Sequence, residues 1–167
     1  MPLTITSPAF EPNGSIPKKH TCEDDDVSPS LQWSGVPERT RSLALIADDP
    51  DAPDPAAPKR VYVHWVLYNV PPTSSGLAEG ASRSRLPEGA REGKNDGGNI
   101  GYMGPCPPIG RHRYFFKLYA LDTTLGDLGS TATKADLEAA MRGHVIEQAE
   151  IVGTYQGEHG PAQRRSR

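Results

Sequence analysis

Three short segments of this sequence combine chemically active side chains with a backbone stiffened by proline, glycine or β-forming neighbours. They are residues 48–53 (Asp-Asp-Pro-Asp-Ala-Pro), the pair His64-Trp65, and residues 104–114 (Gly-Pro-Cys-Pro-Pro-Ile-Gly-Arg-His-Arg-Tyr). Carboxylates, imidazoles and phenols move protons and form hydrogen bonds with anions, and carboxylates and imidazoles also bind metals. The three segments therefore suggest a small-anion site, an acid/base site or a metal site.

The first two segments also have purely structural interpretations. The prolines of residues 48–53 fix the backbone, so the aspartates can either cap surface turns or point into a cleft. A half-buried strand histidine such as His64 is commonly a core residue with satisfied hydrogen bonds. Strand alternation places His64 on the face of Tyr62, Val66 and Tyr68, and Trp65 on the opposite face.

The third segment is the most specific pattern of the three. If a strand begins at His112, then His112 and Tyr114 project to one face and Arg113 to the other. The Gly/Pro stretch before them is rigid, and its backbone N–H groups can form an anion-binding nest.

Familiar catalytic motifs are absent from the sequence. It contains no Gly-x-Ser-x-Gly elbow, His-Glu-x-x-His motif, Gly-Lys-Ser/Thr loop or Rossmann glycine fingerprint. The Asp-rich stretches do not fit an EF-hand, because neither frame supplies both the central glycine and the final glutamate.

Composition favours a loop-rich β protein. The 167 residues include 17 Gly and 17 Pro, which argues against long helices and coiled coils. The net charge of −3 argues against a general nucleic-acid binder. No apolar run is long enough for a stable membrane insertion, and the first residues do not resemble a secretory signal, so we expect a cytoplasmic protein.

The elements that must position the three segments are mostly strands. We expect strands at residues 5–10, 31–33, 42–48, 61–70, 113–121 and 150–155. Apolar residues on both faces of 42–48 indicate an inner strand, and the prolines at 50, 53, 55 and 58 predict irregular backbone up to Val61. Residues 73–101 are expected to form a long surface excursion with few apolar anchors.

One helix is expected near the C-terminus. Thr133 and Asp136 form a capping-box pattern, and apolar spacing continues it to Gln148 past a weak point at Gly143. The pattern predicts a single domain over residues 1–156, an antiparallel β-sandwich with helical decoration, followed by a disordered basic tail at 157–167.

The two cysteines, Cys22 and Cys106, lie 84 positions apart and match neither a Cys-x-x-Cys motif nor a disulfide scaffold. Reduced thiols are the expectation.

The three segments, in this order, resemble the phosphatidylethanolamine-binding protein family, most closely its bacterial Raf-kinase-inhibitor-like branch. The resemblance runs from about Ile5 to Gln156 and includes Cys22, residues 28–33 (Ser-Pro-x-Leu-x-Trp) and the ending Gly-Thr-Tyr-Gln at 153–156. It implies a mostly β fold, an antiparallel β-sandwich of two sheets with a C-terminal helix and short peripheral helices. It also implies a small preformed anion pocket at one end.

The resemblance implies a ligand site but no catalytic residue, metal or cofactor. Its expected ligand-binding residues are Asp49, His64, Gly104, Pro107, His112 and Tyr114. Two imidazoles and a phenol can donate to phosphate oxygens, the glycine segment can add a backbone N–H, and a carboxylate can fix a histidine tautomer or accept from an ammonium group. Asp51 is expected to brace its loop and Arg113 to form a surface ion pair.

Two departures from the family concern the pocket mouth. Mammalian members continue into a further C-terminal helix, whereas this chain stops soon after Tyr155, which predicts a more open mouth or one closed by a second subunit. Cys106 stands where mammalian members tend to have glycine, and it is either an inert thiol or one activated by nearby histidines.

These observations support a binding protein for phosphate, phosphoethanolamine or a phospholipid headgroup, which is not an enzyme. The alternative is a metal- or acid/base-dependent enzyme that acts on a small phosphoester through Asp49, His64 and His112. The family name adds regulation of a kinase or protease as a third role, although no residue identifies the partner. A homodimer is compatible with the branch.

Overall fold

An inner strand organises the molecule, as the apolar residues on both faces of 42–48 predict. Strand β3 (Ser42–Ala52) lies at the centre of a five-stranded sheet, between β4 (Arg60–Val70) and β7 (Arg111–Leu121). The edges of this sheet are β6 (Arg91–Glu92) beside β4 and β8 (Val145–Gln156) beside β7. A smaller sheet has the order β1 (Thr4–Thr6), β2 (Leu31–Ser34) and β5 (Gly76–Leu77).

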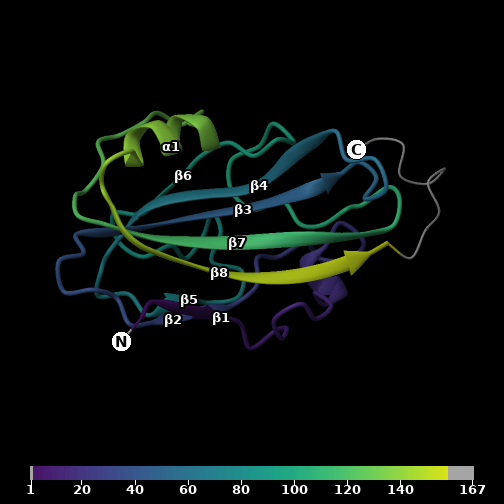
Figure 1. Cartoon of the computed structure of the whole chain (residues 1–167), viewed down its shortest axis with the longest axis horizontal. Coiled ribbons are helices and arrows are strands. Elements are labelled where there is room, and N and C mark those ends of the chain that lie inside the picture. Colours follow the sequence, from purple (N-terminus) through teal and green to yellow (C-terminus); the bar gives the residue numbers. More distant parts are fainter. Residues whose placement is uncertain (1, 158–167) are drawn as a thin grey trace.

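The computed structural model describes residues 2–157 and stacks these sheets with one helix in three layers (Figure 1). Helix α1 (Lys134–Met141) covers the outer face of the large sheet, and the small sheet covers the inner face. A short 3-10 helix, η1 (Lys18–His20), lies in the early loop. All ladders between named strands are antiparallel, which confirms the predicted fold class.

Two apolar cores correspond to the two faces of β3. Leu43, Leu45 and Ala47 pack between the sheets, while Ala44 and Ile46 pack toward α1. Because each core needs its own residues from β3, the strand carries almost no exposed positions.

The capping box at the start of α1 is confirmed, but the predicted helix is too long. Thr133 accepts a hydrogen bond from the Asp136 N–H, and Asp136 Oδ2 accepts one from the Thr133 N–H at 3.0 Å. The helix ends at Met141, and Gly143 has a φ of +83°, a left-handed conformation that L residues rarely adopt. The chain then enters β8, so residues 145–148, assigned to the helix by their spacing, lie in a strand.

The prolines after residue 48 interrupt the chain less than expected. Strand β3 continues through Pro50 to Ala52, with irregular pairing to β4 between Asp49 and Ala52. Residues 73–101 are also better anchored than expected, since they contribute β5, β6 and the buried residues Leu77, Ala81 and Asn95.

No helix among the described residues is long and apolar enough to span a bilayer. The predicted tail falls almost entirely on residues 158–167, which lie outside the described part of the chain. The single-domain boundary, the cytoplasmic location and the homodimer stay predictions.

Candidate functional site

The three chemically active segments meet at one end of the large sheet. Antiparallel pairing places the end of β3 beside the starts of β4 and β7, at the right-hand side of Figure 1. A pocket of about 50 Å³ opens there, and its lining includes Asp49, His64, Pro107, His112 and Tyr114. A cavity needs about 10–15 Å³ by this measure to hold one water, so the pocket takes a few waters or one small tetrahedral group.

Asp49 and His112 form a buried pair at the base of the site. The Asp49 Oδ2 to His112 Nδ1 distance is 2.6 Å, and the two side chains are 4% and 1% exposed. The other ring nitrogen of His112, Nε2, lies 2.8 Å from the carbonyl oxygen of Ile109. Both neighbours are acceptors, so both ring nitrogens carry a proton when both bonds are made, and the ring is then an imidazolium.

The pKa of His112 follows from this geometry. Burial is the largest single influence and lowers the pKa, but the hydrogen bond and charge of Asp49, with smaller contributions from Ile109 and Asp51, outweigh it. The pKa is therefore raised above its ordinary value of 6.5.

His64 reaches the pocket through a bulge in β4. Ala47 pairs with Trp65 and Asp48 pairs with Val63, so one extra residue, His64, stands between successive pairs. The bulge places both His64 and Trp65 on the inner face, where the His64 ring contacts Tyr114 and Trp65 joins the core between the sheets. The prediction that His64 and Trp65 point to opposite faces is wrong, because strict alternation fails at a bulge.

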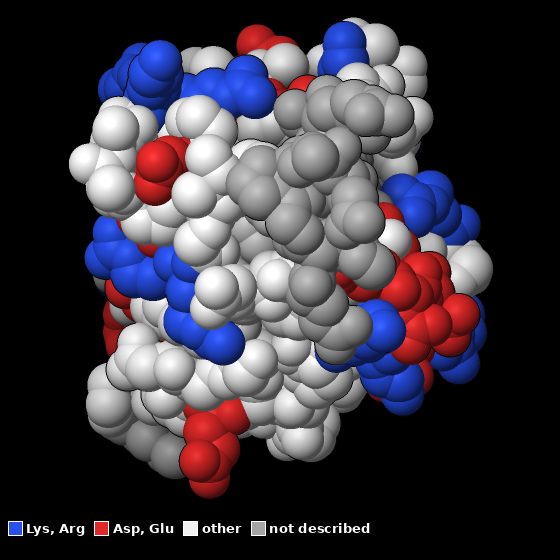
Figure 2. Space-filling view, turned by 90° about the vertical axis from the view of Figure 1, so that its right-hand side faces the viewer, with Lys and Arg blue, Asp and Glu red and all other residues white. Residues whose placement is uncertain are grey.

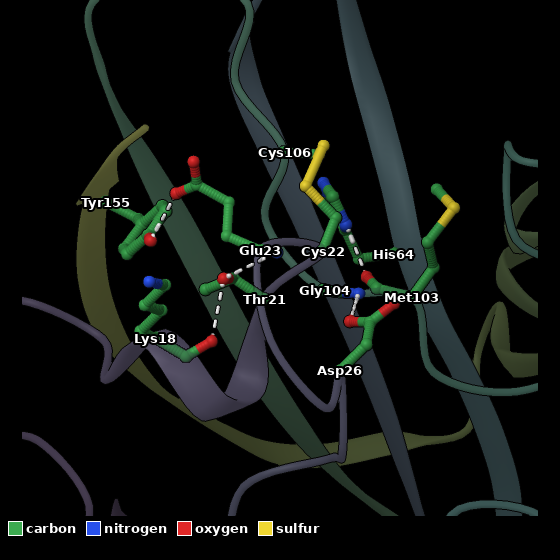
Figure 3. Close-up of a disulfide and its surroundings, with 10 residues drawn as sticks. All are labelled: Lys18, Thr21, Cys22, Glu23, Asp26, His64, Met103, Gly104, Cys106 and Tyr155. Carbon is green, nitrogen blue, oxygen red and sulfur yellow. Dashed lines mark hydrogen bonds between the residues drawn. A yellow bond between two sulfur atoms is a disulfide. The ribbon is translucent and has the colours of Figure 1, made fainter. Parts of the chain in front are cut away.

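The backbone sets the tautomer of His64. Its Nδ1 donates to the carbonyl oxygen of Met103 at 2.5 Å, while the Met103 N–H donates to the carbonyl of His64 at 2.9 Å (Figure 3). In the neutral ring the proton therefore lies on Nδ1, and Nε2 is the nitrogen directed away from Met103.

A row of rings forms one wall of the site, and it includes two residues that sequence reasoning missed. The rings of Tyr62 and His64 are 5.2 Å apart, those of His64 and Tyr114 are 5.2 Å apart, and Tyr114 stacks on His112 at 6.3 Å. The Arg60 guanidinium lies 4.9 Å from the Tyr62 ring centre, and both residues line the pocket. The two-residue spacing of 60, 62 and 64 is the signal that could have found them.

Gly104 does not line the pocket. Its N–H donates to Asp26 Oδ1 at 2.8 Å, and a Cβ at this position would lie 2.0 Å from the His20 carbonyl oxygen. Its N–H is used within the protein, and the glycine is needed where the 104 segment crosses the early loop, so a ligand contact by Gly104 stays a prediction.

Asp51 and Arg113 have the bracing roles expected of them. The guanidinium of Arg113 donates to both oxygens of Asp51, at 3.0 and 2.9 Å, and the Arg113 N–H adds a third bond at 2.9 Å. The hydrogen bonds from Arg113 outweigh burial and lower the pKa of Asp51. This pair holds the end of β3 against the start of β7 beside the pocket.

The prediction of reduced thiols is also wrong. Cys22 and Cys106 form a disulfide, with their Cα atoms 5.5 Å apart (Figure 3). The early loop folds back against the 103–106 segment, where the Cys22 N–H donates to the Pro105 carbonyl. Cys106 lines the pocket, so the bridge forms part of its wall.

The site does not assemble the ligand set of the metal-enzyme alternative. The described residues contain no group of three His, Cys, Asp or Glu side chains placed to hold a metal ion. Asp49 faces His112 directly, and the nitrogen that His112 directs at it is protonated in the ion pair.

Charges of both signs surround this end of the molecule. Figure 2 views it from the side where β3 and β8 end, and shows Lys and Arg intermixed with Asp and Glu among the described residues. Among the described residues that line the pocket, Arg60 carries a positive charge, while the His112 imidazolium is paired with Asp49.

Comparison with known proteins places this arrangement in a family. Residues 6–156 match the family model of the phosphatidylethanolamine-binding protein. The chain belongs to the phosphatidylethanolamine-binding protein family. Within this family, a UPF0098 protein of Methanothermobacter thermautotrophicus is 50% identical over 154 residues, which cover 92% of this chain and 98% of the relative.

Two solved structures of the family are also similar to this chain. A homologue from Chlamydia trachomatis has a TM-score of 0.85 and 43% identity, covering 94% of this chain and 99% of its own. YbcL of E. coli, described as a member of the mammalian family, has a TM-score of 0.86 and 35% identity, covering 95% and 100%. The relatives come from archaea as well as bacteria, so the bacterial assignment stays a prediction.

Proposed function

We propose that the pocket binds a phosphate group, either free phosphate or the phosphate of a small ester or headgroup, and does not turn it over. The observation that carries this proposal is the His112 ring, whose two nitrogens both face acceptors within 2.8 Å. A histidine held as an imidazolium beside Asp49 neutralises that buried carboxylate, so the base of the pocket does not repel an anion.

The other lining groups suit the same ligand. Arg60 adds a guanidinium at the pocket wall, and Tyr62, His64 and Tyr114 add phenol and imidazole groups. Among the described residues that line the pocket, the one acid is Asp49, and it faces His112, so its charge is locally balanced. The pocket volume of about 50 Å³ matches a tetrahedral group better than a bulky ligand.

Binding without turnover is supported by the state of the groups that could attack phosphorus. Cys106 is engaged in a disulfide. Asp49 Oδ1 accepts from the Asp51 N–H at 2.7 Å and Oδ2 accepts from His112, so both oxygens are already hydrogen-bonded within the protein. Catalytic nucleophiles instead need an adjacent base and a free line of attack.

The test is an NMR titration of the histidine ring signals with inorganic phosphate, phosphoethanolamine and a glycerophosphodiester as separate arms. We expect the signals of His64 and His112 to move and to saturate at millimolar ligand, with their pKa values raised by the bound anion. The exposed His144, which pairs with Asp122 at 2.8 Å, is the internal control and should not move.

The three arms distinguish the source of the phosphate. If the His64 and His112 signals move with inorganic phosphate alone, the ligand is a free anion. If they move more strongly with the diester, the ligand is a lipid headgroup. Unmoved His64 and His112 signals in every arm would contradict the proposal. Release of phosphate from the monoester at a rate that scales with protein concentration would instead support the enzyme alternative.

A further inference from the structure

The segment 105–108, which forms part of the pocket wall, has few backbone N–H groups for hydrogen bonds to the rest of the fold. Three of these four residues are prolines, which have no N–H, so Cys106 carries the single backbone donor of the stretch. Backbone hydrogen bonds can therefore hold this wall mainly through its carbonyl groups.

The bonds that hold the segment lie before the wall. Met103 pairs with His64, the Gly104 N–H donates to Asp26, and the Pro105 carbonyl accepts from Cys22. The Tyr102 hydroxyl adds a hydrogen bond to the His20 carbonyl at 2.7 Å. The disulfide at Cys106 (Figure 3) is the last of these attachments. Pro107 and Pro108 follow it and line the pocket.

Within residues 2–157, the next hydrogen bond along the chain belongs to the site itself. The Ile109 carbonyl accepts from His112 Nε2 at 2.8 Å, and β7 begins at Arg111. A wall that moves between Cys106 and Arg111 would therefore also change the acceptor that keeps His112 doubly protonated.

We propose that the Cys22–Cys106 disulfide is a thiol-exchange site that controls the pocket. A small dithiol reduces the disulfide, and the reduced protein binds phosphate more weakly. This inference rests on the proposed phosphate site. Both cysteines are half-buried rather than fully enclosed, so a small reductant can reach the bridge.

The exchange balances without a metal or cofactor. A thiolate of the dithiol attacks Cys106 Sγ, the Sγ–Sγ bond breaks, and Cys22 Sγ leaves as a thiolate that takes up a proton. The second thiol of the reductant then displaces Cys106 and closes a cyclic disulfide. The protein gains two electrons and two protons, and the dithiol loses them.

The first experiment compares phosphate affinity in the oxidised and dithiothreitol-reduced wild-type protein. We expect affinity to fall roughly tenfold on reduction, because ordering the wall then has to occur on binding. Removal of dithiothreitol and reoxidation with oxidised glutathione should restore it. By linkage, saturating phosphate should lower the reduction potential of the bridge by about 30 mV for a tenfold affinity ratio.

Two variants separate the bridge from general disturbance of its loop. Cys22→Ser, which leaves every pocket-lining residue in place, should bind like the reduced protein with or without reductant. Asp25→Asn, an exposed neighbour in the same loop, should bind like the wild type and stay sensitive to reductant. Equal phosphate affinity in the oxidised and reduced wild type would overturn the proposal.

A ligand-free measurement keeps this proposal distinguishable from the phosphate proposal. Reduction should shift the ring signals of His112, whose Nε2 partner lies in the released wall, while the His144 signals stay in place. If neither redox state binds phosphate, the proposed function fails, and the ligand-free shift still decides whether the bridge controls the pocket geometry. Unchanged His112 signals on reduction would overturn that control.

Discussion

Both carboxylate oxygens of Asp49 accept hydrogen bonds from the protein itself. Oδ1 faces the Asp51 N–H and Oδ2 faces His112 Nδ1, at 2.7 and 2.6 Å. This carboxylate therefore positions the imidazolium and compensates the burial of its charge. The sequence suggests that Asp49 either fixes a histidine tautomer or accepts from an ammonium group. The geometry supports the first of these roles.

The Asp49–His112 pair predicts a pH dependence of stability. The folded pKa of His112 is raised above 6.5, so above that pH the folded state binds more protons than the unfolded state. The free energy of unfolding should fall as pH rises from 6.5 through the folded pKa of His112. Urea unfolding followed at a series of pH values from 6 to 9 measures this slope.

Another buried histidine limits where this slope can be read. Burial lowers the pKa of His20, so its contribution is lost as pH falls below 6.5, the opposite sense. Asp49→Asn should reduce the slope above pH 6.5 and cost roughly 1–3 kcal/mol at neutral pH. Asp122→Asn, at the exposed pair with His144, is the matched control and should leave the slope unchanged. An undiminished slope in Asp49→Asn would assign the effect to another group.

At the scale of the elements, the bulge in β4 decides which residues form the site. Strands β3, β4 and β7 and the capping box of α1 were predictable, because alternation and capping are local patterns. The extra residue at His64 was not, since it is visible only in the pairing of Ala47 and Asp48 with β4. Without the bulge, strict alternation would direct His64 toward α1.

The opposite face of β3 carries a second buried carboxylate, which attaches α1 to the sheet. Asp48 Oδ2 lies 3.1 Å from Lys117 Nζ and 2.8 Å from Lys134 Nζ, and its side chain is 1% exposed. Lys117→Met or Lys134→Met alone leaves one ammonium partner, so each should cost under about 1 kcal/mol. The double variant leaves a buried, uncompensated carboxylate and should cost roughly 3–5 kcal/mol.

Urea unfolding of the two single variants and the double variant measures this coupling as a double-mutant cycle. Lys19→Met, at the exposed pair with Glu79, is the control and should change stability very little. The phosphate response of the pocket should be the same in all four proteins, because Asp48 faces α1. Additive costs would show that the lysines do not share one carboxylate in solution.

At the scale of the whole molecule, glycine and proline frame the pocket. The stretches Pro50 to Pro58 and Gly97 to Gly110 adjoin Asp49 on one side and His112 on the other, as the sequence suggests. Their attachment was not predictable, because the disulfide and the Asp26–Gly104 contact join segments about 80 positions apart. Composition shows that such loops are stiff but not which loops touch.

We expect the disulfide to stabilise the protein mainly by restricting the conformations of the unfolded chain. It closes a loop of 84 residues, and in the chain-entropy model a loop of this size stabilises the folded state by about 4.6 kcal/mol. Guanidinium unfolding with and without reductant measures this difference, and Cys22→Ser should match the reduced wild type. The denaturant slope should also rise on reduction, because the unlinked unfolded chain exposes more surface. A reduced protein that unfolds at the same guanidinium concentration, with the same slope, would show that the unfolded ensemble already keeps the two loops together.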